Sequence, residues 1–250
     1  MQYGTRRSRD SIPITIPLLL ASGSLGLLAI VWRRISAPRR EAHVRSDAAA
    51  AHELPAPSLH DAPDTQSLPV GTGDVFHRKY EIMLTDIASS SRDVMRLMQR
   101  NVAELAPSML AHFEKTSGTS GLICVGDEFD ITMLGPWNGM VRVSESSPDA
   151  FTLVTLDGHP EAGHITFSVA AHERDARALH VRIESWARAR DSIVAAAYGA
   201  IGIGKQVQTE VWITFLQRLA TLAGMHGTPE VVITTETLPV SAFDDATGNA

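Results

Sequence analysis

Hydrophobic and polar residues alternate along much of residues 76–186, and this pattern predicts a series of β-strands. The clearest segment is GDEFDITML, in which Phe129, Ile131 and Met133 fall on one face. Similar alternation occurs in KYEIMLTDI, SMLAHFEK, GMVRVSES, AFTLVTL, HITFSVAAHE and ALHVRIESW. Glycine, proline, asparagine and aspartate occupy the connections, as β-hairpins require. We therefore expect about six consecutive strands with short links, paired as an antiparallel meander.

Two segments follow a helical period instead. In SSSRDVMRLMQRNVAEL, apolar residues recur at steps of three or four, a serine can cap the start, and Pro107 ends the segment. A longer helix is predicted from Asp191, its N-cap, to about Ala223, just before Gly224. At about 1.5 Å per residue this helix is roughly 50 Å long. Its apolar face comprises Ile193, Ala197, Ala200, Gly204, Val207, Val211, Phe215, Leu219 and Leu222.

The sequence AYGAIGIGKQV within this predicted helix nearly matches a phosphate-binding loop. Gly199, Gly204 and Lys205 have the spacing of that motif, but Gln206 replaces the serine or threonine that binds magnesium. Such a loop also follows a buried strand, whereas one helical period continues on both sides of this segment. We therefore expect no nucleotide and no other cofactor. The glycines instead indicate a helix that lies close to the sheet or leaves space beneath it.

An uncharged run of 22 residues, SIPITIPLLLASGSLGLLAIVW, occupies residues 11–32. As a helix it is long enough to cross the hydrocarbon core of a bilayer. A cleaved signal peptide is the alternative, although Arg33, Arg34 and Ile35 fit a cleavage site poorly. We therefore predict a single-pass membrane protein with a transmembrane helix at residues 11–32. Three arginines precede the run and five follow it, which slightly favours a cytoplasmic position for the C-terminal body.

Charge is distributed unevenly along the chain. Residues 1–45 carry eight arginines and two acidic residues, whereas the remainder has a net charge of −12. An acidic body is unfavourable for contact with a phosphate backbone, so we expect no nucleic-acid partner. Residues 33–75 begin basic and become rich in alanine and proline without a sustained period, which is typical of a flexible linker.

These observations predict five regions along the chain. They are a basic segment at 1–10, the transmembrane helix at 11–32, the linker at 33–75, a folded domain at 76–224, and a tail at 225–250 with a possible short strand at Val231–Thr235. The single cysteine, Cys124, excludes a disulfide within the chain.

A strand, a helix, several antiparallel strands and a long C-terminal helix follow one another in the helix-grip fold of Bet v 1-like and START-like proteins. The segments TLDGHPEAGHITFSV, VRIESWARARD and VWITFLQRL also resemble a family of uncharacterised proteins, domain-of-unknown-function family 1990, over residues 78–223. The most specific match is Gly158-His159-Pro160-Glu161 with Gly163. The resemblance implies an α+β fold in which an antiparallel sheet wraps around the long helix and encloses an apolar cavity. It implies no reaction, because a fold alone does not define a function.

Several residues are candidates to line this cavity. They are Trp137, Trp186, Tyr198, Gly204, Val207 and Val211. Core packing would explain the aromatic residues equally well. His159 and His164 lie close in sequence, but no third ligand accompanies them, so we expect no metal site. No catalytic residue is identified.

The sequence therefore predicts a membrane-anchored domain that binds an apolar small molecule or a lipid. Two alternatives remain open: an enzyme of polyketide-cyclase type on the same fold, and a protein-interaction module. A polar pair directed into the cavity would favour the enzyme. A purely apolar cavity would favour the binding domain, and a filled interior would favour the interaction module.

Overall fold

The computed structural model describes residues 38–45, 62–118, 120–133, 138–173, 175–195 and 203–241. Its strands are β1 (Arg39–Arg45), β2 (Thr72–Leu84), β3 (Ala111–Ser117), β4 (Glu128–Met133), β5 (Asn138–Ser146), β6 (Ala150–Thr155), β7 (Glu161–His172), β8 (Asp175–Ala189) and β9 (Val231–Leu238). Its helices are the short 3-10 helix η3 (Leu68–Val70), α2 (Ser91–Arg100), α3 (Val102–Leu105) and α5 (Ile203–Leu222). From β2 to α5 the elements follow the order predicted from the sequence.

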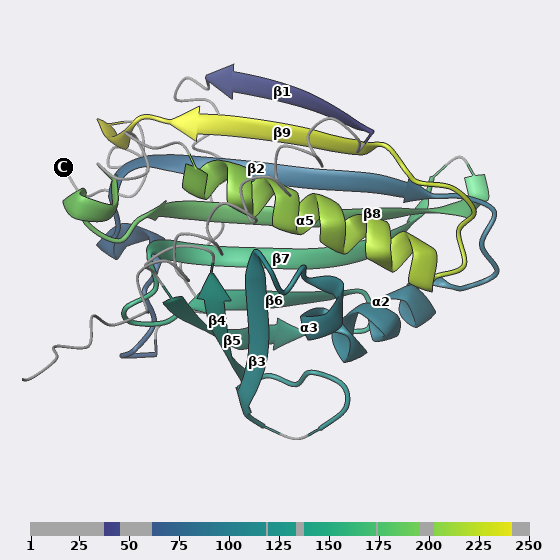
Figure 1. Ribbon diagram of the computed structural model, residues 1–250, viewed down its shortest axis with the longest axis horizontal. Helices are drawn as coiled ribbons and strands as arrows, with labels where there is room; N and C mark the ends of the chain where they lie inside the picture. Colours follow the sequence, from purple (N-terminus) through teal and green to yellow (C-terminus); the bar gives the residue numbers. More distant parts are fainter. Residues whose placement is uncertain are drawn as a thin grey trace, which may run out of the picture.

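All nine strands belong to one sheet, in the order β1-β9-β2-β8-β7-β6-β5-β4-β3. Neighbouring strands are antiparallel, except that β1 and β9 run parallel. Helix α5 crosses one face of this sheet (Figure 1). The run predicted at Val231–Thr235 is part of β9, which lies between β1 and β2.

The alternation along the strands determines which side chains face α5. On β8, Leu179, Val181 and Ile183 are buried in the main core, where Phe215 and Leu219 of α5 are also buried. The residues between them in β8 point to the opposite face, because successive side chains of a strand alternate. The main core therefore lies between the sheet and α5.

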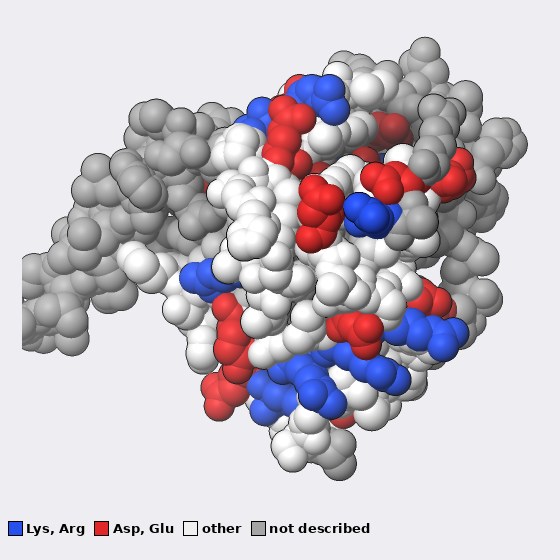
Figure 2. Space-filling model, turned by 90° about the vertical axis from the view of Figure 1, so that its right-hand side faces the viewer, with Lys and Arg blue, Asp and Glu red and all other residues white. Residues whose placement is uncertain are grey.

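Helix α2 covers one end of this core, near the C-terminal end of α5 (Figure 1). It begins with a capping box, in which the Asp93 N–H donates to Ser90 Oγ and the Ser90 N–H donates to the Asp93 carboxylate. Met95 and Met98 are fully buried on its inner side. Its outer side carries the exposed residues Arg92, Arg96 and Arg100. Figure 2 shows basic side chains gathered on this end of the molecule.

Part of the region predicted to be a flexible linker, residues 33–75, is folded onto the sheet. Arg39–Arg45 form the edge strand β1, and β2 begins at Thr72 rather than near Lys79. The intervening residue Gln66 is buried and hydrogen-bonded to β6, because its N–H donates to Thr155 O at 2.8 Å. The folded unit therefore includes residues well before position 76.

The predicted fold class requires correction. The sheet is a mixed nine-stranded sheet rather than an antiparallel one, since β1 joins it in parallel. Within the residues that the structure describes, no helix combines the length and apolar character needed to span a membrane. The predicted transmembrane helix at 11–32 lies outside the described residues, and the prediction of a single-pass membrane protein with a cytoplasmic body is not supported.

Candidate ligand-binding site

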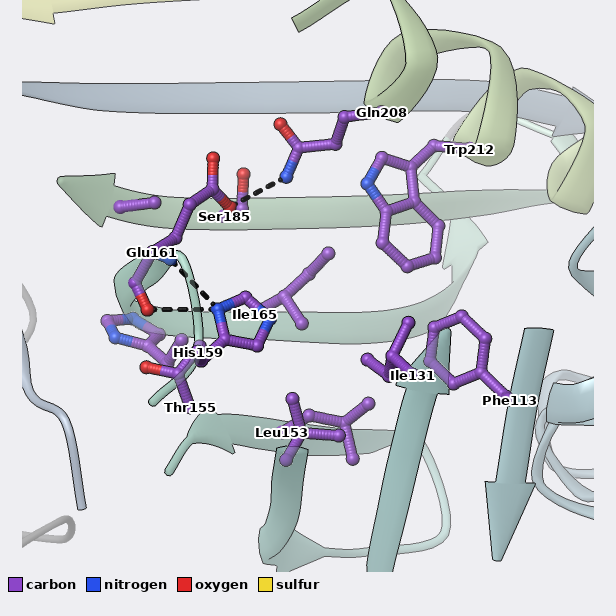
Figure 3. Close-up of a pocket in the computed structure, with 13 residues that line it drawn as sticks. Phe113, Ile131, Leu153, Thr155, His159, Glu161, Ile165, Ser185, Gln208 and Trp212 are labelled. Atoms are coloured by element: carbon purple, nitrogen blue, oxygen red, sulfur yellow. Dashed lines mark hydrogen bonds between the residues drawn. The ribbon is translucent and has the colours of Figure 1, made fainter. Parts of the chain in front are cut away.

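A cavity of about 60 Å³ lies between the sheet and the first half of α5 (Figure 3). Strands β3 to β8 line it on the side of the sheet, and Gln208 and Trp212 line it on the side of α5. The residues that line it are Phe113, Ile131, Val141, Leu153, Thr155, His159, Glu161, His164, Ile165, Ser185, Ala187, Gln208 and Trp212. Small ligands usually bind in such enclosed, mainly apolar spaces that contain a few polar groups.

The polar and apolar lining residues are separated in space. Figure 3 shows Glu161, Ser185 and Gln208 together on one side, and Phe113 and Ile131 on the other. Where β8 lines the cavity, the small residues Ser185 and Ala187 continue the row that holds Leu179, Val181 and Ile183. The change from large to small side chains along this row leaves room for the cavity.

A chain of hydrogen bonds fixes the polar side of the cavity. Gln208 Nε2 donates to Glu161 Oε2 at 3.0 Å, and Arg78 donates to Gln208 Oε1. The guanidinium of Arg78, which is 4% exposed, also lies 5.3 Å from the ring centre of Phe76. Nearby, the Tyr80 hydroxyl lies 3.5 Å from Thr209 Oγ1, and burial raises the pKa of Tyr80. Tyr80 is therefore uncharged at neutral pH.

The turn between β6 and β7 carries His159 and Glu161 into the cavity wall. Gly158 at this turn has a φ of 93°, a conformation that favours glycine. Gln66 holds the turn from outside, since its Nε2 donates to the carbonyl oxygens of His159 and Glu161, each at 2.7 Å. At Gly163 a Cβ would collide with the Trp186 carbonyl, so the glycine allows β7 to approach β8 closely.

His159 is uncharged at neutral pH. Burial lowers the pKa of His159 to about 4, and the positive charge of Arg190 acts in the same direction. Its Nδ1 lies 3.0 Å from both the backbone nitrogen and the carbonyl oxygen of Glu161, so the main chain of Glu161 holds this side of the ring in either tautomer. The other nitrogen, Nε2, donates when Nδ1 accepts and accepts when Nδ1 donates.

Trp212 closes the cavity from α5. Its indole is 6% exposed and packs edge-on against three aromatic rings, with centroid distances of 6.4 Å to Phe113, 5.5 Å to Phe167 and 5.9 Å to Phe215. Its indole nitrogen is turned towards the side of the cavity where Gln208 and Ser185 lie (Figure 3). This orientation places a polar N–H group in an otherwise aromatic wall.

None of the residues predicted from the sequence to line the cavity is among its lining residues in the part of the chain that the structure describes. Val207 and Val211 of α5 are buried in the main core, and the cavity is lined by the next residues, Gln208 and Trp212. Gly204 lies in the first turn of α5. Trp186 lies on the opposite face of the sheet. Trp137 and Tyr198 are outside the described residues.

On that opposite face, Trp186 belongs to a small second core with Leu68, Val75 and Leu238. Its ring stacks on His77, with ring centres 3.6 Å apart. His77 Nε2 lies 2.6 Å from Glu184 Oε1, and this hydrogen bond lowers the pKa of Glu184. This cluster is part of the packing beneath η3 and is separate from the cavity.

Sequence reasoning missed most of the polar lining. His159 and Glu161 were named only in the motif of the family resemblance, with His159 also considered as a metal ligand, and Gln208 and Ser185 were not singled out. The small residues Ser185 and Ala187, which follow three large apolar residues on the same face of β8, were the available signal. Among the residues that the structure describes, no three His, Cys, Asp or Glu side chains are grouped so that they could hold a metal ion.

The comparison with protein families confirms the resemblance found in the sequence. Residues 110–221 match the model of a family described as Domain of unknown function (DUF1990). This segment begins just before β3 and ends within α5, so it includes all the residues that line the cavity. No curated protein matches the chain.

Several solved structures are similar to this chain in the arrangement of their backbone. Norcoclaurine synthase from Thalictrum flavum shares 15% identity, with a TM-score of 0.44, over 69% of this chain and 98% of its own. A hypothetical protein from Helicobacter pylori shares 9% identity, with a TM-score of 0.42, over 58% of this chain and 86% of its own. A conserved protein from Geobacillus kaustophilus shares 13% identity, with a TM-score of 0.40, over 60% of this chain and 97% of its own.

Proposed function

We propose that this chain is a binding domain for an apolar small molecule or a lipid. One observation carries the proposal, namely the cavity beneath α5, whose wall contains Phe113, Ile131, Leu153, Ile165 and Trp212. Removing an apolar group from water into such a space is favourable, at about 25 cal/mol for each Å² buried. The few polar groups at one side of the cavity would then fix the orientation of the ligand.

The size of the cavity restricts how much of a ligand it can hold. Sites for drug-sized ligands are typically about 300–1,000 Å³. At about 60 Å³ the cavity is much smaller than that. We therefore propose that it receives a small molecule, or one end of a longer one.

A cavity-filling substitution tests this function. Ala187→Ile adds three methyl or methylene groups at a lining position where the present side chain is short. Ala171→Ile is the matched control, because Ala171 lies exposed on the neighbouring strand β7. Mass spectrometry of small molecules retained by the full chain, and titration with an apolar fluorescent probe, are the measurements.

We expect the wild type and Ala171→Ile to retain ligand and to bind the probe. Ala187→Ile should bind the probe at least about tenfold more weakly while still unfolding cooperatively, which corresponds to about 1.4 kcal/mol. Equal binding by all three proteins would place the probe elsewhere and would contradict the proposed function.

An enzyme of polyketide-cyclase type is a second candidate, and the carboxylate of Glu161 favours it. This group lines the cavity beside Ser185 and Gln208, so it is positioned to accept a proton from a bound molecule. Glu161→Gln keeps the size of the side chain and removes the base. An enzyme would lose turnover of a retained molecule in this variant, whereas a binding domain would release the same molecule unchanged from both proteins.

A further inference from the structure

One polar group in the cavity wall is buried without a hydrogen-bond partner among the described residues, namely the indole Nε1–H of Trp212. His159 Nε2 and the Ser185 hydroxyl line the same cavity, and no described residue is hydrogen-bonded to either of these atoms. Trp212, His159 and Ser185 are 6%, 7% and 4% exposed, respectively. Buried polar groups in proteins are nearly always hydrogen-bonded, so the unpaired indole N–H indicates a missing partner.

The rings of Trp212 and His159 are held in place by rigid surroundings. The ring of His159 is fixed by hydrogen bonding between its Nδ1 and the main chain of Glu161 and by contact with Gly139. The indole of Trp212 is fixed by the rings of Phe167 and Phe215. A donor that is held rigidly in a water-poor site favours an oxygen atom that carries partial negative charge.

The balance of donors and acceptors restricts the ligand further. The indole N–H of Trp212 can only donate, so the ligand must offer an acceptor. A carbonyl oxygen accepts hydrogen bonds and donates none, which suits this donor. The carboxylate of Glu161 lines the same cavity and would repel an anionic ligand. These features favour a neutral carbonyl group over a carboxylate.

We propose that the cavity binds the carbonyl end of a neutral and otherwise apolar molecule. The carbonyl oxygen accepts a hydrogen bond from Trp212 Nε1–H, and His159 lines the same cavity beside it. The apolar part lies against Phe113 and Ile131. This inference rests on the proposed function, because it specifies the ligand of the same cavity.

Cyclobutanone and methylenecyclobutane are suitable probes. Their shapes match, and they differ only in that the carbonyl oxygen of the first is a methylene group in the second. A cavity of about 60 Å³ has room for roughly five water-sized groups, at about 10–15 Å³ each, which is the number of heavy atoms in these molecules. The comparison therefore isolates the contribution of the carbonyl oxygen.

The indole N–H signals of the full chain, labelled with ¹⁵N, report the binding. The chain has four tryptophans, and Trp212→Phe identifies the signal of Trp212 because that signal disappears. Trp186 is the internal control, since it lies on the opposite face of the sheet. We expect cyclobutanone to move the Trp212 indole proton to lower field in a saturable manner, without moving that of Trp186.

Cyclobutanone should bind about tenfold more tightly than methylenecyclobutane, the ratio expected for hydrogen bonds to otherwise unpaired donors. In Trp212→Phe, which keeps an aromatic ring at this position, the preference should fall to about threefold. If the two probes bind equally and move the Trp212 signal alike, the carbonyl inference is overturned and the proposed function stands. If neither probe moves the Trp212 signal at any concentration, the cavity takes no ligand of this size, and both are overturned.

Discussion

The imidazole ring of His159 occupies the space beside Gly139 that the Cβ of any larger residue would require. Gly139 lies on β5, opposite Ile131 of β4, and His159 lies on the turn between β6 and β7. The absence of a side chain at Gly139 therefore makes room for the ring of His159, although 20 positions separate the two residues in the sequence. This contact holds the ring at the cavity wall.

Gly139→Ala should destabilise the fold by about 1–3 kcal/mol, the usual cost of forcing extra atoms into a packed site. His159→Ala should also destabilise it, since a buried ring and its hydrogen bond are lost. In the double variant the new methyl group enters the space that the ring has left. Denaturant unfolding of the three variants should therefore show that the double variant loses less stability than the sum of the single losses. Additive losses would show that the two residues do not share this space.

The neutral state of His159 predicts a pH dependence of stability. In the folded chain its pKa is about 4, against an ordinary value of 6.5, so between these values the unfolded chain binds more protons. Stability is therefore present above about pH 6.5 and is lost as the pH falls towards 4. Between pH 7 and pH 5, His159 should account for a loss of about 2 kcal/mol in the free energy of unfolding.

Urea unfolding at the two pH values measures this loss. His159→Gln removes the titrating group and should make the difference between pH 7 and pH 5 smaller by about 2 kcal/mol. His112→Gln is the control, because His112 is exposed on β3 and should leave the difference as in the wild type. An unchanged pH dependence in His159→Gln would mean that folding does not lower the pKa of His159.

An ion pair between Arg39 and Glu210 joins the edge strand β1 to helix α5. Arg39 Nη1 lies 2.5 Å from Glu210 Oε1, and Arg39 Nη2 lies 3.2 Å from Glu210 Oε2. The side chains are 9% and 1% exposed, respectively. Arg39→Met would leave the Glu210 carboxylate buried without this partner and should destabilise the fold by about 3 kcal/mol.

Arg40→Met is the matched control for Arg39→Met. Arg40 is exposed on the same strand, so its replacement should change stability by less than about 0.5 kcal/mol. Adding Glu210→Gln to Arg39→Met removes the buried charge and should recover part of the loss. Equal effects of the two arginine variants in thermal unfolding would show that the ion pair does not hold β1.

The sequence was sufficient to predict most of the strands and both longer helices because their signals are local. Alternation in β4 and β8 and the capping box of α2 each depend on residues a few positions apart. The position of β9 between β1 and β2 was not predictable in this way, since strand pairing depends on distant residues. β1 was missed because RREAHVR has no apolar alternation, which is common for an exposed edge strand.

The candidate site was less predictable than the fold. The helical spacing correctly predicted that Val207, Val211, Phe215 and Leu219 of α5 are buried against the sheet. The cavity, however, is lined by the neighbouring positions, Gln208 and Trp212. Gln66 had no recognisable signal, because its role depends on carbonyl groups near residue 160 of the folded chain. A local pattern shows which face is apolar, but it does not show where packing is incomplete.

The final prediction concerns the near match to a phosphate-binding loop. Gly204 and Lys205 lie within α5, whereas Gly199 and Gly202 lie outside the described residues. A phosphate-binding loop follows a buried strand directly. Here β8 ends at Ala189 and residues 192–195 form a helical turn, in which the Val194 N–H donates to Asp191 Oδ1 at 2.9 Å. We therefore expect magnesium and ATP to leave the melting temperature of the full chain unchanged.

Two variants test this prediction further. Gln206→Ser completes the motif by adding the hydroxyl that would bind magnesium, and it should still show no response to ATP. Lys205→Ala removes the lysine of the motif, and its melting temperature should likewise be the same with and without ATP. A true site at a ligand concentration 100-fold above its Kd would stabilise the fold by about 2.7 kcal/mol, which a melting curve detects easily. A saturable rise in the melting temperature with ATP that is lost in Lys205→Ala would show that this segment binds a phosphate, and it would contradict the prediction.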